Sequence, residues 1–180
     1  KHDPRAELRA TIRSLFCPSV ADEKHAVCRY VARYEWLKER LGIDPRRLPV
    51  PQCTAFEDLL AKIQPESATL IFPTSHMNSP ASMYGHTLLT VETASKSKLL
   101  AFAINYSAIV QGVTFAPVFI AKGLCGGYPG YYSILPYCAK LQEYSDVNDR
   151  DIWEYALSLD RDEIRRMLLH IYELDNIYSN

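Results

Sequence analysis

The chain has 180 residues, 48% of them hydrophobic, and a formal net charge of −1 at pH 7. A chain of this size can bury a sizeable core as one domain, and its balanced charge gives no reason to expect a nucleic-acid partner or a strongly charged membrane surface. No run reaches the ~18 apolar residues that a membrane-spanning helix needs. The chain opens at Lys1 without an initiator methionine or a signal peptide, which is typical of a mature or trimmed protein.

Residues 1–64 are predicted to be helical, because apolar residues recur there at helical spacing in three segments. Gly42 is placed to end the second helix, and Thr54 begins a capping-box pattern that opens the third. The apolar positions are Leu8, Ile12, Leu15 and Phe16, then Tyr30, Tyr34, Leu37 and Leu41, and finally Phe56, Leu59, Leu60 and Ile63.

The pattern becomes β-rich after Pro65. Several runs are almost continuously apolar, as expected of strands that are covered on both faces. Between the last two runs, residues 123–137 are predicted to form a shaped loop rich in glycine and tyrosine, and residues 137–150 an amphipathic or irregular segment. The predicted strands are Ala68–Pro73, Thr87–Glu92, Leu99–Tyr106, Val113–Ala121 and Ile152–Leu159.

A final helix is predicted to start at Asp160, which can form a capping box with Glu163. We expect this helix to return the chain to the sheet. Helices therefore precede a mostly antiparallel sheet and one helix follows it, which defines an α+β fold. We interpret the chain as one domain, with an N-terminal helical segment at residues 1–64 and an α+β core at residues 65–180. The buried face of the final helix is predicted to contain Ile164, Met167, Leu168, Ile171 and Leu174.

The most informative stretch for function is Ser75–Glu92, where a polar, turn-rich segment runs into a predicted strand. His86 lies at the junction, and Gly85 lets the backbone turn just before it. A histidine held at the mouth of a sheet, with its ring free to face a cleft, is positioned to act as a general base or acid. A structural role is the alternative for His86, and we expect His76 and His170 to be exposed.

The glycine-rich residues 123–130 lack the pattern of a phosphate-binding loop, and their glycines indicate a close approach of the backbone to a cleft. Cys125 in this segment could act as a nucleophile, although it lacks the helix N-terminus that activates many thiols. The five cysteines contain no C-x-x-C pair, and the acidic residues 143–155 do not fit an EF-hand. We therefore predict no metal site and no cofactor.

Cys28 and Cys53 flank a helix and a proline-rich turn, so that a disulfide between them could close this part of the chain. An exported protein would permit that bond, and a cytosolic one would not. The odd number of cysteines leaves at least one free thiol.

Five segments taken together resemble the N-terminal periplasmic domains of Lnb-type lipoprotein N-acyltransferases. The segments follow the order and spacing of that family and cover most of the chain, which makes the combination more specific than any single motif. They are Cys28–Leu37, Phe72–Thr87, Ala103–Tyr106, Lys122–Gly130 and Glu143–Tyr155.

The resemblance implies an exported domain of the periplasm or cell envelope, related to NlpC- and papain-like thiol enzymes in a permuted order, with His86 as the catalytic base. The expected nucleophile is a cysteine in an Asn-Cys-Ser motif downstream of Asn180, because none of the five cysteines matches that position. In this setting we predict the Cys28–Cys53 disulfide and a cleft beside His86. The residues predicted to line the cleft or orient the histidine are Tyr84, Asn105, Lys122, Gly126, Gly127 and Tyr128.

The implied activity is acyl transfer through a Cys–His pair, with a membrane lipid, lipoprotein or cell-wall component as substrate and a membrane surface nearby. A peptidoglycan-directed amidase or peptidase on the same scaffold is an alternative. Acyl transfer predicts an apolar groove of the size of an acyl tail beside His86, whereas a peptidase predicts a polar, open cleft. A non-catalytic binding domain is the remaining alternative.

Overall fold

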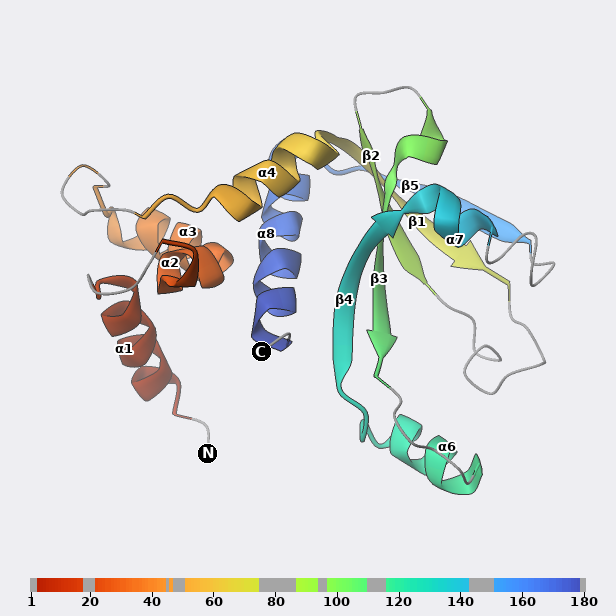
Figure 1. Cartoon of the computed structure of the whole chain (residues 1–180), viewed down its shortest axis with the longest axis horizontal. Coiled ribbons are helices and arrows are strands. Elements are labelled where there is room, and N and C mark those ends of the chain that lie inside the picture. Colours follow the sequence, from red (N-terminus) through yellow and green to blue (C-terminus); the bar gives the residue numbers. More distant parts are fainter. Residues whose placement is uncertain are drawn as a thin grey trace. The chain divides into compact units, whose positions relative to one another are not determined.

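A computed structural model describes residues 3–17, 22–44, 46, 51–74, 87–93, 97–109, 116–142 and 151–178. The chain divides into two compact units, which are described separately below. The helical unit contains Lys1–Lys62 and Arg166–Tyr178, and the sheet unit contains Ile63–Arg165. The fold is α+β, as predicted, with a five-stranded antiparallel sheet and seven α-helices in the described part of the chain (Figure 1).

The helical unit is built from segments at both ends of the sequence. Its helices are α1 (Pro4–Leu15), α2 (Ala26–Arg29), α3 (Val31–Leu41), α4 (Thr54–Ile63) and the later part of α8 (Arg161–Tyr178). A short 3-10 helix, η1 (Asp22–Lys24), precedes α2. These helices confirm the helical prediction for residues 1–64.

The ends of these helices follow local sequence signals. Asp3 caps α1, because its carboxylate accepts hydrogen bonds from the backbone N–H groups of Arg5 and Ala6 at 2.9 and 3.2 Å. Gly42 ends α3 in the left-handed conformation with φ of 58°, which confirms its predicted role as a C-cap.

The start of α4 differs from the predicted capping box. Glu23 Oε1 accepts hydrogen bonds from the backbone N–H and the hydroxyl of Thr54, both at 2.8 Å, and from the N–H of Ala55 at 3.2 Å. The hydroxyl of Thr54, with smaller contributions from the two N–H groups, lowers the pKa of the Glu23 carboxyl. The cap of α4 therefore comes from a residue far back in the sequence, which a local pattern cannot reveal.

The core of the helical unit consists of two apolar clusters. One contains Leu15, Val27, Tyr34 and Leu37. The other joins α3 to α4 and α8 and includes Phe56, whose ring lies 5.2 Å from that of Tyr172, centroid to centroid. The buried members of this second cluster are Val31, Ala32, Phe56 and Leu169.

The sheet unit contains five strands in the order β4-β3-β2-β1-β5, and all neighbouring strands are antiparallel. In the central strands β1 to β3, consecutive residues such as Ala68 and Thr69 are buried, which confirms that both faces of the sheet are covered there. The strands are β1 (Pro65–Pro73), β2 (Leu88–Thr93), β3 (Phe102–Ala108), β4 (Gly130–Pro136) and β5 (Ile152–Leu157).

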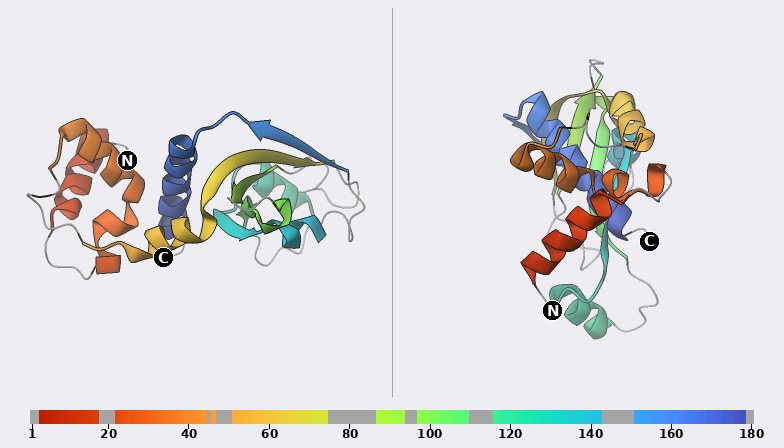
Figure 2. Two further views of the ribbon diagram at one scale, coloured as in Figure 1. Left: turned by 90° about the horizontal axis from the view of Figure 1, so that it is seen from above. Right: turned by 90° about the vertical axis from the view of Figure 1, so that its left-hand side faces the viewer.

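One face of the sheet is covered by two short helices, η3 (Lys98–Leu100) and α7 (Tyr137–Gln142), which lie on the same side of the strands (Figure 2). Tyr137 at the start of α7 is only 4% exposed and packs on the sheet. The cluster beneath these helices contains Ile71, Leu88, Ala101, Ala103 and Tyr137.

Two predictions for the sheet unit are wrong. Residues 116–121 of the run Val113–Ala121, predicted as a strand, belong to helix α6 (Ala116–Leu124), and residues 113–115 lie outside the described residues. Pro117 suits the first turn of a helix, where a missing N–H costs nothing. Much of the predicted loop 123–137 is strand β4, since its tyrosines and Ile134 favour a strand.

The capping box at the start of α8 is confirmed. Asp160 Oδ1 accepts from the N–H of Glu163 at 2.8 Å, and Glu163 Oε2 accepts from the N–H of Asp160 at 2.9 Å. From Arg166 onward, however, α8 belongs to the helical unit and not to the sheet unit, to which we expected it to return.

Candidate functional site

The predicted catalytic base and its immediate surroundings lie outside the described residues. This applies to His86, Tyr84 and His76. The described chain resumes at Thr87, and β2 begins at Leu88 between β1 and β3. A strand therefore follows His86 in sequence almost at once, where the polar-to-apolar transition predicted it.

Asn105 is the predicted cleft residue that the sheet brings nearest to the start of β2. Its neighbour Ile104 pairs with Leu89, so Asn105 lies beside the first residue of β2. The side chain of Asn105 is 4% exposed and donates a hydrogen bond from Nδ2 to Ser107 Oγ at 2.5 Å. A buried amide at this place has a fixed orientation, as a residue that positions a neighbouring group requires.

The other predicted cleft residues gather in the turn between α6 and β4. The N–H of Gly127 donates to the carbonyl oxygen of Lys122 at 2.7 Å, and Gly126 has a φ of 69°, which favours glycine. The ring of Tyr128 lies 5.8 Å from that of Phe119, centroid to centroid, and its hydroxyl is buried without a hydrogen-bond partner among the described residues.

This turn is tied to β3 at the end of the strand, because the N–H of Ile109 donates to the carbonyl oxygen of Pro129 at 2.8 Å. Asn105 pairs with Ser133 further along the same β3–β4 ladder. The structure thus brings together Lys122, in the last turn of α6, with Gly127 and Tyr128, which follow this helix, while Asn105 occupies a separate position on the sheet.

Two aromatic groups on the sheet were missed by the sequence analysis. Tyr106 lies across Gly130, where any Cβ would overlap its hydroxyl, and its ring is 4.8 Å from that of Tyr132, centroid to centroid. At the opposite edge of the sheet, Phe72 of β1 pairs with Trp153 of β5, and both are well exposed. The register that brings these rings together depends on strand pairing, which no local motif encodes.

A polar network also lies on the sheet. Glu92 accepts hydrogen bonds from the hydroxyls of Ser67 and Thr69, and these bonds, that of Ser67 first, lower the pKa of its carboxyl. Lys98 donates to Glu154 at 2.5 Å, and this bond raises the pKa of the lysine.

Glu154 also contacts Tyr137, whose hydroxyl donates to Glu154 Oε1 at 3.1 Å. Burial, reinforced by the charge of Glu154, raises the pKa of Tyr137 to about 12. The phenol therefore stays protonated at neutral pH and acts as a hydrogen-bond donor.

The cysteines fall into two groups. Cys28 and Cys53 form a disulfide with an S–S length of 2.04 Å and a Cα–Cα distance of 5.1 Å. Cys17, Cys125 and Cys138 are not joined in disulfides. Cys125 follows the C-terminal end of α6, whereas reactive cysteines are typically found at helix N-termini. No cluster of potential metal ligands occurs among the described residues.

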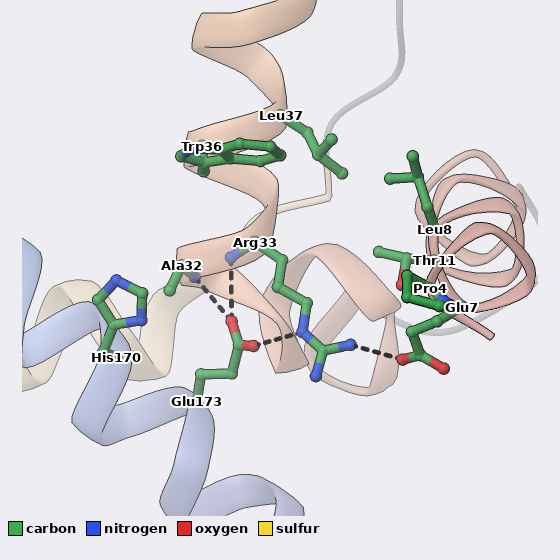
Figure 3. A pocket seen from close by; sticks show the side chains of 10 residues that line it. All are labelled: Pro4, Glu7, Leu8, Thr11, Ala32, Arg33, Trp36, Leu37, His170 and Glu173. Atoms are coloured by element: carbon green, nitrogen blue, oxygen red, sulfur yellow. Dashed lines mark hydrogen bonds and ion pairs between the residues drawn. The ribbon is translucent and has the colours of Figure 1, made fainter. Parts of the chain in front are cut away.

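The helical unit contains a groove of about 520 Å³ between α1, α3 and α8 (Figure 3). Leu8, Trp36 and Leu37 form an apolar wall, and Glu7, Arg33 and Glu173 form a charged floor. His170, which we expected only to be exposed, is exposed and also lies at the side of this groove.

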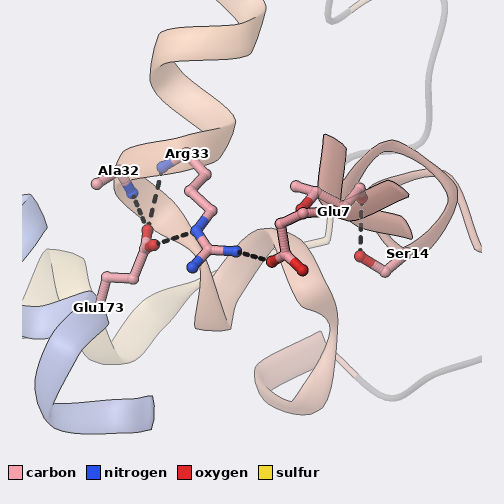
Figure 4. Close-up of polar contacts among 6 residues, drawn as sticks. Glu7, Ser14, Ala32, Arg33 and Glu173 are labelled. Atoms are coloured by element: carbon pink, nitrogen blue, oxygen red, sulfur yellow. Dashed lines mark hydrogen bonds and ion pairs between the residues drawn. The ribbon is translucent and has the colours of Figure 1, made fainter. Parts of the chain in front are cut away.

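The charged floor is connected from one helix to the next (Figure 4). Arg33 donates from Nε to Glu173 Oε1 at 2.8 Å and from Nη1 to Glu7 Oε1 at 3.1 Å. Glu173 Oε2 accepts the backbone N–H groups of Ala32 and Arg33, both at 3.0 Å. The sequence analysis missed this site because its residues come from three separate helices.

A disulfide-bonded α+β chain has the features of an exported domain. Within the described residues, no helix is both long and apolar enough to cross a bilayer. Comparison with known families matches residues 55–180 to the Lnb N-terminal periplasmic domain. The chain therefore belongs to this family, which confirms the predicted resemblance and the periplasmic location.

A second family, a domain of unknown function (DUF7843), matches residues 1–40. The helical unit therefore combines elements of both matched segments. Helices α1 to α3 come from the DUF7843 segment, and α4 and α8 come from the Lnb segment. No curated protein and no solved structure matches the chain.

Proposed function

We propose that this periplasmic domain takes part in acyl transfer to lipoproteins through a Cys–His pair, with His86 as the base. The observation that carries the proposal is the match of residues 55–180 to the Lnb N-terminal periplasmic domain, together with the motif around His86. The strand that starts at Leu88 and the buried amide of Asn105 beside it support a rigid setting for this histidine.

In the proposed reaction, His86 removes the proton of a cysteine thiol and the thiolate attacks the ester carbonyl of a membrane lipid. The C–O ester bond breaks, the leaving alcohol takes the proton from the imidazolium, and a thioester forms. The amine of a lipoprotein then attacks the thioester, which yields an amide and restores the thiol. If water replaces the amine, the same steps give hydrolysis.

The nucleophile of this reaction is not assigned to any of the five cysteines. Cys28 and Cys53 are joined in the disulfide and have no thiol to offer. Following the resemblance, we propose that the cysteine lies in an Asn-Cys-Ser motif after Asn180. The permuted NlpC-like arrangement, in which the histidine precedes the cysteine, is part of the same proposal.

The proposal is tested in the full-length protein with His86→Ala, using a phospholipid donor, a lipoprotein acceptor and mass spectrometry of the acceptor. Loss of a general base is expected to lower the rate by roughly 10²- to 10⁴-fold. His2→Ala is the matched control, because it removes a histidine that lies outside the five segments of the resemblance. Acyl transfer at a near wild-type rate after His86→Ala would show that the proposed base is wrong.

A second test separates the proposed nucleophile from the free thiols of this chain. Residues 1–180 alone are expected to show no thiol-dependent acyl transfer. Activity of this chain that is lost in Cys125→Ser or Cys138→Ser would instead assign the nucleophile to that cysteine.

A further inference from the structure

The groove of the helical unit has the size and composition of a ligand site. Its volume of about 520 Å³ lies within the range of small-molecule pockets. Leu8 of α1 and Trp36 of α3 both line the groove and remain 46% and 54% exposed. Figure 3 shows the apolar wall on one side of the space and the charged floor on the other.

Hydrogen-bonding groups that are not used within the floor belong to Arg33 and Glu7. Glu173 is largely occupied, because its two oxygens accept three hydrogen bonds and its side chain is 7% exposed. Arg33 uses Nε and Nη1, and its guanidinium lies 5.0 Å from the ring centroid of Tyr30. Glu7 uses Oε1, so that Arg33 Nη2 and Glu7 Oε2 have no hydrogen-bond partner among the described residues. A donor and an acceptor thus lie side by side where the floor opens to solvent.

The charges beside Arg33 favour a cation, although the guanidinium of Arg40 lies 5.9 Å from the ring centroid of Trp36 at the apolar wall. Two carboxylates, Glu7 and Glu173, face one guanidinium, and Glu7 is the exposed one, with 70% of its side chain accessible. An ammonium group can therefore reach Glu7 while an adjacent carbonyl oxygen accepts from Arg33. An apolar side chain attached to the same ligand would cover Trp36 and Leu8.

The length of the groove distinguishes a peptide from a lipid. Its lining residues on α1 run from Pro4 to Thr11, which at ~1.5 Å per residue is a span of about 10 Å. Three extended peptide residues have about this length. A lipid acyl chain, which reaches through half of a ~30 Å bilayer core, is longer than this span.

We propose that this groove binds the free N-terminus of a peptide whose first residues are apolar. The α-ammonium contacts Glu7, the first carbonyl contacts Arg33, and the first side chains pack on Leu8 and Trp36. This inference goes beyond acyl transfer, and it is tested by binding alone, so that it can fail or succeed independently of the proposed function.

Trp36 supplies the measurement, because the chain has only two tryptophans and the other, Trp153, lies in the sheet unit. In the 180-residue chain carrying Trp153→Phe, trileucine amide is expected to shift the emission of Trp36 to the blue in a saturable manner. N-acetyl-trileucine amide, which lacks the cation, is expected to bind roughly tenfold more weakly.

Variants locate the contact. Glu7→Gln is expected to lower the affinity for trileucine amide roughly five- to tenfold. Glu39 is an exposed acid on α3 outside the groove, and Glu39→Gln should leave the affinity unchanged. Leu8→Ala is expected to weaken the binding of both peptides. Leu41→Ala, which removes an exposed leucine outside the groove, should change the binding of neither. Circular dichroism of each variant verifies that it is folded.

Three results would overturn the proposal: equal binding of the two peptides, no effect of Glu7→Gln in a folded variant, or laurate binding at least as tightly as trileucine amide. The last result would assign the groove to an acyl chain.

Discussion

Glu173 of α8 contacts both the side chain of Arg33 and the backbone at the start of α3. Its carboxylate lies 2.8 Å from Arg33 Nε and accepts hydrogen bonds from two backbone N–H groups of the same helix turn. These bonds satisfy donors that a helix N-terminus otherwise leaves open. One buried side chain thus provides the cap of α3 and the partner of its arginine.

Glu173→Ala is therefore expected to destabilise the helical unit by about 3 kcal/mol, because it leaves Arg33 and two N–H groups without their partner. Urea unfolding followed by Trp36 fluorescence in the Trp153→Phe background measures the loss. Glu39→Ala is the control and should change the free energy of unfolding by less than ~0.5 kcal/mol. An equally small change for Glu173→Ala would contradict the capping role.

The Cys28–Cys53 disulfide closes a loop between residues 25 positions apart. Constraint of the unfolded chain by a loop of this size contributes roughly 3 kcal/mol, so Cys28→Ser should lower the stability of the helical unit by that amount. Cys125→Ser, which removes an exposed free thiol, serves as the control. Intact mass after alkylation without reductant checks the bond directly: labelled Cys28 and Cys53 would show that it is absent.

Tyr137 should titrate at a higher pH than an ordinary tyrosine. Its pKa is raised to about 12, so the stability it contributes is fully present below pH 10, its ordinary value, and is lost as the pH rises toward 12. The difference in absorbance at 295 nm between the wild type and Tyr137→Phe isolates this group. Glu154→Gln should lower the pKa only in part, because burial is the larger cause. A titration near pH 10 in the folded protein would refute the buried phenol.

Gln64 connects α4 to β1 with φ of 46°, a left-handed conformation that side chains other than glycine rarely adopt. The side chain is exposed, so removing it costs no packing. Gln64→Gly is therefore expected to stabilise the protein by about 0.5–1 kcal/mol, and Gln64→Val to destabilise it by about 1 kcal/mol. Thermal unfolding of the two variants measures the change in stability of each relative to the wild type. A change of the same sign in both variants would contradict a strained backbone at Gln64.

The sequence predicted those elements whose signals are local. Helical spacing, Gly42 and the capping box at Asp160 specify structure within a few residues, and each was found where predicted. The apolar run around Pro117 fits both a strand and a buried helix by pattern alone, and the assignment to a strand was wrong. The proline was the local signal that could have decided it.

The sites divide in the same way. The motif around His86 is continuous in sequence and could be recognised, although it lies outside the described residues. The groove could not be predicted, because Arg33 and Glu173 are separated by 140 positions and meet only through the packing of helices. Likewise, Glu23 caps α4 across 31 positions.

Because the helical unit is built from the two ends of the chain, it can be completed only after the last helix has been made. Residues up to 62 and residues from 166 onward belong to this unit, whereas the sheet unit is one continuous stretch between them. As the chain emerges from the N-terminus, the sheet can be completed while α3 still lacks the carboxylate that caps it. The packing of α3 is therefore complete only when α8 has formed. Until then, the Cys28–Cys53 bond is a covalent restraint that can keep the first helices close together.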